Sequence, residues 1–156
     1  MIICVSGTPG TGKTTLSRRL ARELGLSYLD GNEIISKYNL SEGFDKKKGC
    51  KIVDTKRFAM SAIKECEKLK KGAIIDSHLS HNLPPSKISL CIICKADLKV
   101  LKKRLEKRGY SKAKVRENLD AEIFDVCLTE ATEKGHDVII LKDYKPLLRK
   151  IKKELF

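Results

Sequence analysis

Residues 5–15, Val-Ser-Gly-Thr-Pro-Gly-Thr-Gly-Lys-Thr-Thr, match the pattern G-x-x-x-x-G-K-[ST] from Gly7 to Thr14. This is the Walker A pattern, a phosphate-binding loop that connects a buried strand to a helix. An apolar run, residues 2–5, precedes the loop, and leucines at helical spacing follow it. The stretch therefore predicts a strand, a turn and a helix in that order, with a nucleotide phosphate site where the helix begins.

Each residue type in this loop suits phosphate binding. Glycines such as Gly10 and Gly12 let backbone N–H groups approach phosphate oxygens, which larger side chains would obstruct. The helix that begins near Lys13 adds free N–H groups and a dipole that favours an anion. In such loops the lysine ammonium reaches the β- and γ-phosphates, and the hydroxyl that follows, here Thr14, takes one position on Mg²⁺.

The length and apolar content of the chain limit its class. A chain of 156 residues is most simply one domain, and it contains no linker, repeat or low-complexity tract. The first apolar run has no basic flank, which does not fit a secretory signal, and no run approaches the roughly 18 apolar residues of a membrane span. We therefore expect one soluble, cytoplasmic domain with no membrane contact.

The charge is strongly positive and unevenly distributed. The chain has 33 Lys and Arg against 20 Asp and Glu, a net charge of +13. Residues 95–116 are especially rich in lysine and arginine. Such a balance attracts polyanions, which include nucleotides and RNA. A lysine-rich surface that is simply solvated explains the charge equally well, because charge alone identifies no partner.

Six cysteines occur without an export signal, and most lie inside apolar patterns, so we expect reduced and mostly buried thiols. Cys91 and Cys94 have the C-x-x-C spacing of metal and redox sites. They lie within a probable strand, however, and residues three apart on a strand point to opposite faces. We therefore predict that this pair does not share a metal ion.

Strands and helices alternate along the chain. We expect strands at residues 2–5, 27–29, 73–76, 88–94 and 138–141, and helices at 13–24, 54–70, 97–108, from 112 to beyond 126, and from Pro146. Residues 30–53 form an irregular polar insert, which in a compact protein is usually functional or disordered. The alternation predicts right-handed crossovers and a parallel sheet covered on both faces, an α/β fold.

In such sheets ligands bind beyond the carboxyl ends of the strands. This edge should hold the loop at Gly7, the carboxylate of Asp76 and residues 142–146. Asp76 ends an apolar strand, as a Walker B carboxylate does when it reaches the Mg²⁺ shell, although it could simply cap a turn. His78, two residues later, is expected on the same face, where it could orient a water or a phosphate or be structural.

Phosphoryl transfer needs cations around the migrating group and exclusion of water. Arg104 and Arg108 lie four residues apart on a predicted helix, beside a break at Gly109. An arginine can hold two phosphate oxygens at once with its planar guanidinium. The pair therefore predicts a mobile arginine-bearing flap, with a solvated charged face as the alternative.

Three segments together resemble a known family. They are the loop at 7–15, Ile75-Asp76-Ser77-His78, and Arg108-Gly109-Tyr110 continuing to Glu117-Asn118-Leu119-Asp120-Ala121-Glu122-Ile123. This combination resembles the Fap7 family, also called adenylate kinase isoenzyme 6 or CINAP, from about residue 1 to about 146. The resemblance implies a P-loop NTPase with an adenylate-kinase-like three-layer αβα fold around about five parallel strands. It also implies a nucleoside-monophosphate insert near 30–53 and a short lid near 107–117.

The resemblance further implies an activity and partners. It implies reversible phosphoryl transfer from ATP to AMP with Mg²⁺, tolerance of other monophosphates, and a weak ATPase. It implies a role in maturation of the small ribosomal subunit through a ribosomal protein of the S11 type, with possible rRNA contact. Carried over by position, the residues that hold ATP phosphates would be Gly10, Gly12, Lys13, Thr14 and Thr15. Arg108 would contact the phosphates from the lid, Lys145 would lie near the adenine, and Asp76 and His78 would serve Mg²⁺ binding and hydrolysis.

One position departs from the family pattern. Related adenylate kinases often carry an arginine in the monophosphate insert near position 36, where this chain has Ser36 beside Lys37. A lysine is a point charge and cannot hold two phosphate oxygens as a fork does, which bears on AMP selectivity. Arg57, one turn into the following helix, is a candidate to compensate.

Three functions fit these observations. The first is a nucleoside monophosphate kinase. The second is an assembly factor in which ATP binding and hydrolysis switch affinity for a ribosomal partner, with incidental kinase activity. The third is a kinase that acts on a small metabolite. A GTPase does not fit, because the chain has no N-K-x-D motif.

Overall fold

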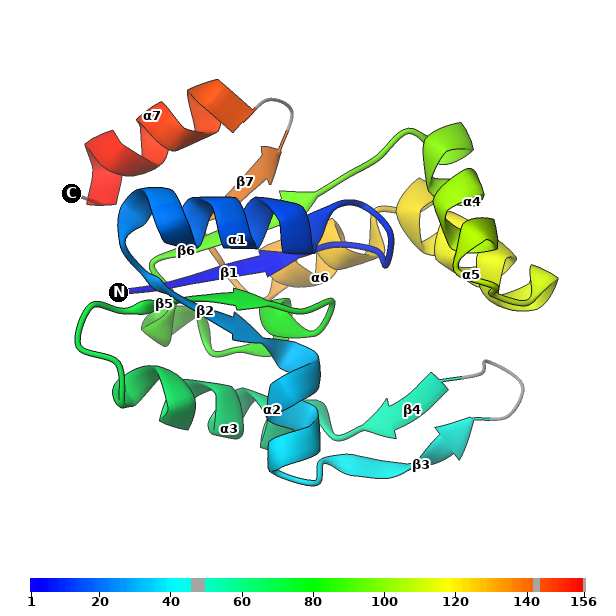
Figure 1. Ribbon diagram of the computed structural model, residues 1–156, viewed down its shortest axis with the longest axis horizontal. Helices are drawn as coiled ribbons and strands as arrows, with labels where there is room; N and C mark the ends of the chain where they lie inside the picture. The colour runs from blue at the N-terminus through cyan, green and yellow to red at the C-terminus, as the bar shows by residue number, and fades with distance from the viewer. Residues whose placement is uncertain (46–49, 142–143, 156) are drawn as a thin grey trace.

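The computed structural model describes residues 1–45, 50–141 and 144–155, with the backbone alone for residues 50, 51, 144, 145, 154 and 155. Its central sheet has five strands, all parallel, in the order β2-β5-β1-β6-β7 (Figure 1). They are β1 (Ile2–Ser6), β2 (Ser27–Asp30), β5 (Ala73–Asp76), β6 (Leu90–Cys94) and β7 (Val138–Leu141). The predicted α/β fold with five parallel strands is confirmed.

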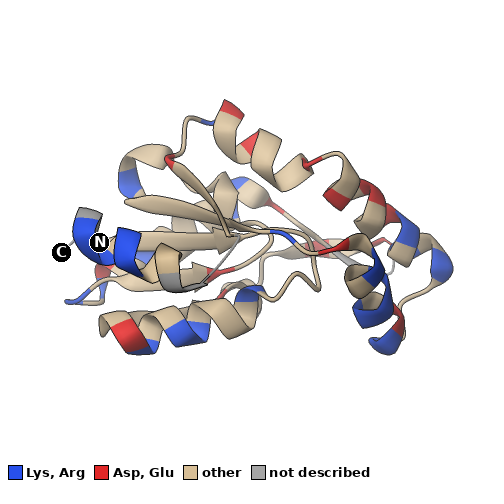
Figure 2. Cartoon of the chain, turned by 90° about the horizontal axis from the view of Figure 1, so that it is seen from above, with Lys and Arg blue, Asp and Glu red and all other residues tan. Residues whose placement is uncertain are grey.

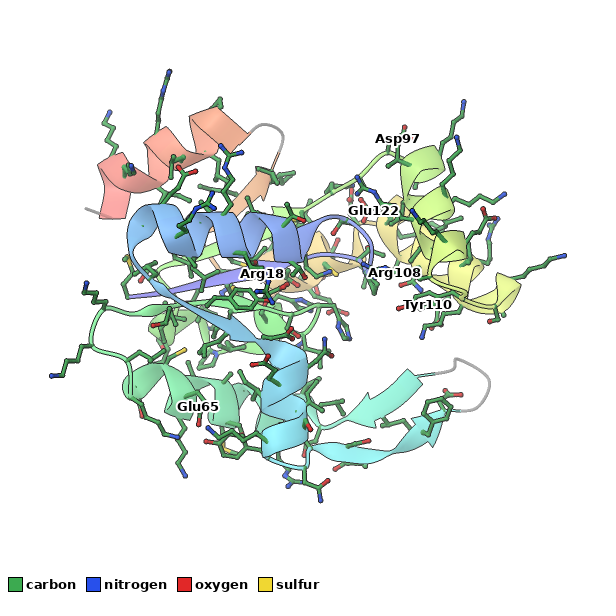
Figure 3. All side chains as sticks on the ribbon, in the orientation of Figure 1. Arg18, Glu65, Asp97, Arg108, Tyr110 and Glu122 are labelled. Carbon is green, nitrogen blue, oxygen red and sulfur yellow. The ribbon has the colours of Figure 1, made fainter. Side chains whose placement is uncertain are left out.

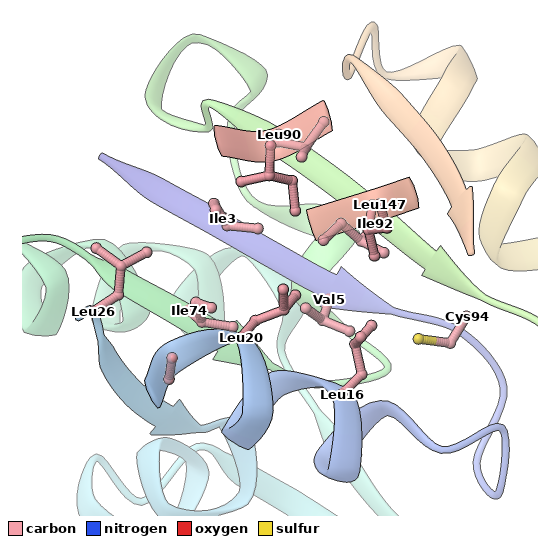
Figure 4. Close-up of a cluster of buried hydrophobic side chains, with 12 residues drawn as sticks. Ile3, Val5, Leu16, Leu20, Leu26, Ile74, Leu90, Ile92, Cys94 and Leu147 are labelled. Carbon is pink, nitrogen blue, oxygen red and sulfur yellow. The ribbon is translucent and has the colours of Figure 1, made fainter. Parts of the chain in front are cut away.

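Helices cover both faces of this sheet. Those on the faces are α1 (Lys13–Leu24), α3 (Thr55–Glu67), α6 (Val126–Glu133) and α7 (Tyr144–Leu155). The other two long helices, α4 (Leu98–Lys107) and α5 (Lys112–Ile123), pack on each other beyond one end of the sheet (Figure 1). Leucines of α1 and α7 pack with β1 and β6 on one face, as Figure 4 shows. On the other face α3 packs against β5, and α6 packs against β1 and β6. The result is the expected three-layer αβα arrangement.

Short polar side chains fix where several helices begin. The carboxylate of Asp54 accepts hydrogen bonds from the first N–H groups of α3 at 2.8 and 3.1 Å. The carboxylate of Asp97 does the same for α4 at 2.9 and 3.2 Å. Such caps satisfy N–H groups that have no partner inside the helix. At the other end of α1, Gly25 adopts a left-handed conformation with φ of 66°, which ends the helix.

The insert at 30–53 is more regular than its sequence indicates. It contains α2 (Gly31–Lys37) and an antiparallel hairpin of β3 (Ser41–Asp45) and β4 (Cys50–Val53). The central residues of β3 are exposed, so no buried alternation marks it as a strand. The lysine run at 46–48 lies outside the described residues. In Figure 1 the hairpin and the α4–α5 pair project from the same end of the sheet.

The predicted long helix from residue 112 is wrong. Two helices, α5 and α6, occupy this region, and Asp125 between them has a φ of 52°. That left-handed conformation cannot continue a right-handed helix. The start of the last helix also differs from the prediction, because Pro146 is the third residue of α7 rather than the first. Among the described residues, no helix has the length and apolar character to cross a membrane.

Candidate active site

A cavity of about 980 Å³ lies beyond the carboxyl ends of the central strands. The loop before α1, the end of β5, and the α4–α5 pair form its walls. Eight of the residues predicted for the site line it together: Gly10, Gly12, Lys13, Thr14, Thr15, Asp76, His78 and Arg108. The structure thus brings together residues from positions 10 to 108 of the chain, as the parallel topology requires.

The loop conformation depends on glycine. The φ values of Gly7, Gly10 and Gly12 are 134°, 92° and 97°. Residues that carry a side chain rarely adopt such positive values. A Cβ at Gly7 would lie 2.3 Å from the backbone oxygen of Cys94, whereas one at Gly12 would meet nothing within 4 Å. The first glycine therefore allows the loop to pass close to β6, and the last lies open toward the cavity.

Lys13 lies over the loop that it follows. Its ammonium donates to the carbonyl oxygens of Gly7 at 2.8 Å and Thr8 at 3.0 Å. Burial lowers the pKa of Lys13, and the negative charge of Asp76 partly opposes this effect. The lysine is thus a desolvated cation at the position where the motif requires one. Thr14 and Thr15, in the first turn of α1, are exposed to the same cavity.

Asp76 is a buried carboxylate, 5% exposed, at the end of β5. The hydroxyl of Tyr28 donates a hydrogen bond to its Oδ2 atom at 3.0 Å. The guanidinium of Arg18 in turn lies 4.4 Å from the centre of the Tyr28 ring. Burial and the charge of Asp76 raise the pKa of the Tyr28 hydroxyl, so it remains a donor. These contacts hold the carboxylate in place through one oxygen.

Asp76 and Thr14 fit the Mg²⁺ role that the sequence predicts. Both offer oxygen ligands, a carboxylate and a hydroxyl, and Mg²⁺ prefers oxygen. Both also line the same cavity as Lys13. The donor set therefore suits Mg²⁺ held between two side chains and the phosphates of a nucleotide.

His78 follows β5 in a turn and contributes to the cavity wall. Its side chain is exposed toward the cavity, and nearby protein atoms partly desolvate the ring. This desolvation lowers the pKa of His78 below its ordinary value of 6.5, and the charge of Lys13 lowers it further. The ring is therefore neutral at neutral pH, so one of its nitrogens donates a hydrogen bond and the other accepts one.

The α4–α5 pair provides basic and aromatic groups on the opposite wall. Arg104 donates to the backbone oxygen of Gly10 at 3.0 Å. Arg108 ends α4, and Gly109 after it has a φ of 74°. Lys114 lies 4.1 Å from the centre of the Tyr110 ring. In Figure 3 the labelled Arg108 and Tyr110 lie near the turn between the two helices.

Glu122 supports the site from behind the loop, and the sequence analysis missed this role. It is buried, 5% exposed, and its carboxylate accepts from the Thr8 hydroxyl at 2.7 Å and from the backbone N–H of Ala96 at 3.0 Å. One signal could have identified it. Glu122 follows Val115 by seven residues and Leu119 by three, so it falls on the apolar face of its helix. A carboxylate there implies a buried partner.

Three candidate side chains that the structure describes, those of Ser36, Lys37 and Arg57, do not line this cavity. Lys145 lies at the start of α7, where the side chains are outside the description. Lys37 instead pairs with Glu65 at 2.9 Å, and neither Ser36 nor Arg57 lines the cavity; both are exposed. None of these three side chains therefore takes the place of the missing insert arginine in the cavity wall.

Comparisons with known proteins agree with this geometry. The family AAA_18, described as "AAA domain", matches residues 3–125. A Methanocaldococcus jannaschii protein named "Putative adenylate kinase" is 40% identical over 138 residues, 88% of this chain and 76% of that protein. The "Adenylate kinase isoenzyme 6 homolog" of Schizosaccharomyces pombe is 37% identical over 142 residues, 91% of this chain and 79% of that protein.

Solved structures support the fold. A shikimate kinase from Acinetobacter baumannii superimposes with a TM-score of 0.64 and covers 97% of this chain and 90% of its own. The two sequences are 18% identical, so this likeness bears on the fold alone. It shows that the two chains share one fold.

Proposed function

Because this chain belongs to one family with the adenylate-kinase-type relatives of M. jannaschii and S. pombe, we propose that it is a nucleoside monophosphate kinase. It transfers the terminal phosphoryl group of ATP to AMP, or to another monophosphate, and releases two diphosphates. It also hydrolyses ATP slowly when no acceptor is bound. The observation that carries this proposal is the meeting of the loop, Asp76 and Arg108 around one cavity.

The phosphates of ATP bind along the loop and the first turn of α1. Backbone N–H groups of this segment, together with the helix dipole, hold the β- and γ-phosphates. Lys13 exchanges its two bonds to loop carbonyls, at 2.8 and 3.0 Å, for bonds to phosphate oxygens. Because the ammonium is already desolvated, it interacts strongly with the charge that develops in the transition state.

Mg²⁺ bound by Thr14 and Asp76 would neutralise phosphate charge and orient the transferred group. The hydroxyl of Tyr28 donates a hydrogen bond of 3.0 Å to Asp76 Oδ2, which keeps the carboxylate at the edge of the cavity. His78, neutral at working pH, accepts a proton from an attacking water and so serves the hydrolytic reaction more than the transfer.

We assign the parts around the cavity to the two substrates. Residues 107–117 act as the lid, and Arg108 contacts the phosphates while Gly109 supplies the hinge. Residues 30–53, with α2 and the hairpin, accept the monophosphate. Closing the two parts excludes water and favours transfer over hydrolysis. Lys145 is assigned to the adenine.

The basic segment at α4 and α5 favours a second candidate function, in ribosome maturation. Lys and Arg residues are frequent along α4, and α5 carries both basic and acidic residues (Figure 2). The segment from Lys95 to Arg116 carries much of the net charge of +13. This surface suits ribonucleoprotein, so the chain could act in small-subunit maturation as an ATP-driven switch. Its partner would be a ribosomal protein of the S11 type, with rRNA contact.

The experiment that separates these functions measures ADP from Mg-ATP with and without AMP. Stimulation by AMP, with AMP consumed, supports the kinase. Slow phosphate release without stimulation contradicts it and favours the switch, and stimulation only by a metabolite identifies a small-molecule kinase. Lys13→Met should abolish both reactions, whereas Lys102→Met, at an exposed residue 3.9 Å from Glu106, should not.

A further inference from the structure

A compact group of two thiols and an imidazole lies inside the core, apart from the nucleotide cavity. Cys4 on β1 and Cys91 on β6 are direct partners in adjacent parallel strands, and both are 0% exposed. His136, just before β7, is 8% exposed. One ligand atom from each residue lies within 4.8 Å of the other two. Residues from three parts of the chain thus converge at one buried point.

The imidazole of His136 is oriented by one hydrogen bond and lacks another. Its Nε2 atom lies 3.0 Å from the backbone oxygen of His81, so Nε2 carries the proton and donates. Its Nδ1 atom is buried and has no hydrogen-bond partner among the described residues. An unpartnered buried acceptor is unfavourable, because it has lost its hydrogen bond to water without gaining another. Metal-binding histidines characteristically donate one N–H to a carbonyl and present the other nitrogen to the ion.

We propose that Cys4, Cys91 and His136 bind a thiophilic divalent cation, with Zn²⁺ as the best match. Thiolate and imidazole are the ligands that Zn²⁺ prefers, at about 2.3 Å for sulfur and about 2.0 Å for nitrogen. Two thiolates and one neutral imidazole also balance the charge of a divalent ion, and the core disfavours any net charge. Each thiol loses its proton on binding, so two protons leave for each ion bound.

The C-x-x-C spacing does not define this site. Cys94 packs with Val5 and Leu16 on the face of the sheet covered by α1, whereas Cys4 and Cys91 lie on the other face. The second thiolate therefore comes from the neighbouring strand. This metal is separate from Mg²⁺ at the nucleotide cavity, because sulfur and nitrogen ligands suit a softer ion than carboxylate and hydroxyl oxygens.

The test uses the full chain without a histidine tag. Because the cluster is buried, the ion enters during folding, so the reduced chain is unfolded, stripped of metal and refolded with Co²⁺ as a spectroscopic probe. We expect about one Co²⁺ per chain after gel filtration, with a thiolate-to-cobalt charge-transfer band. Protein refolded with Zn²⁺ should also retain about one ion per chain by mass spectrometry of the metal. Wild-type protein without the band or the retained ion overturns the proposal.

Variants show whether these residues hold the ion. Cys91→Ala should lose the charge-transfer band, and His136→Asn should weaken metal retention at least tenfold. Cys66→Ala is the matched control, since Cys66 is buried in a different cluster on α3 and should leave binding unchanged. Equal cobalt binding by wild type and Cys91→Ala contradicts the assignment. A disulfide between Cys4 and Cys91 in freshly purified protein would contradict it as well.

Discussion

The hydroxyl of Thr8 donates a hydrogen bond of 2.7 Å to the buried carboxylate of Glu122, 114 positions later in the chain. The same carboxylate accepts from the backbone N–H of Ala96 at 3.0 Å. One side chain of α5 thus joins the phosphate-binding loop to the segment that leads into α4. The loop and the α4–α5 pair are therefore mechanically connected, and Figure 3 shows Glu122 between them.

Replacing Glu122 should affect both stability and turnover. Glu122→Ala leaves the Thr8 hydroxyl and the Ala96 N–H without their acceptor, so we expect a loss on the order of 1–3 kcal/mol in urea unfolding. The loop should also be less ordered, which lowers kcat. Glu106→Ala is the control, because its partner Lys102 is exposed and lies 3.9 Å away, and its effect should stay within about 0.5 kcal/mol. Equal effects of the two variants would contradict this role for Glu122.

Alanine substitutions at Gly7 and at Gly12 should destabilise the protein for different reasons. Gly7→Ala places a Cβ 2.3 Å from the oxygen of Cys94, in addition to the strain of a φ of 134°, so we expect a loss of about 3 kcal/mol or more. Gly12→Ala meets no atom within 4 Å and bears only conformational strain, about 1–2 kcal/mol. Its main effect should be weaker ATP binding, measured by calorimetry. If Gly12→Ala is the more destabilising variant, this reading of the loop fails.

Two variants can distinguish the proposed metal ligand, Asp76, from the residue that supports it, Tyr28. Asp76→Asn keeps an acceptor for the Tyr28 hydroxyl, which now lies 3.0 Å from Oδ2, so the fold should survive. Loss of the charge should raise the Mg²⁺ concentration needed for half-maximal rate at least tenfold. Tyr28→Phe should shift this requirement only slightly, since the carboxylate remains. A magnesium titration of both variants decides the point, and an unchanged requirement in Asp76→Asn would remove the residue from the metal site.

Both the charge and the planar shape of the Arg108 guanidinium should contribute to the rate. Arg108→Ala removes a guanidinium from the cavity, and we expect kcat to fall about 100-fold with little change in stability. Arg108→Lys should recover only part of the rate, because lysine cannot hold two phosphate oxygens. Arg116→Ala is the matched control on the exposed side of α5, where Arg116 pairs with Asp120 at 3.0 Å. A normal rate in Arg108→Ala would exclude the lid role.

The titration of His78 should show the effect of its surroundings. Its pKa is lowered by crowding and then by Lys13, so its NMR midpoint should lie below 6.5. A lowered pKa in the folded state means that the unfolded state binds the proton more readily. This residue therefore favours folding above pH 6.5, and that contribution is lost as the pH falls toward the folded-state midpoint. In Lys13→Met the midpoint should rise, and a midpoint that stays fixed would contradict the electrostatic coupling.

Local patterns were sufficient for much of the fold. The five parallel strands, the helix after the loop, and the capped starts of α3 and α4 follow from apolar periodicity and from Asp54 and Asp97. The patterns failed where backbone conformation or solvent exposure departs from the local rule. Asp125, with its φ of 52°, interrupts the helix that we predicted from residue 112 to beyond residue 126. The exposed β3 has no apolar alternation that would mark it as a strand.

The sequence by itself determined that a phosphate-binding loop precedes a helix at the edge of a parallel sheet, because glycine spacing and apolar runs act within a few residues of one another. Only the tertiary structure decided which distant groups meet. Glu122 reaches Thr8, and Cys4 lies beside Cys91 and near His136, because strand order and helix packing bring them together. The physical reason is that a buried polar atom is unfavourable without a partner, so it is usually paired. The spacing of residues along the sequence does not identify that partner when it lies far away in the chain.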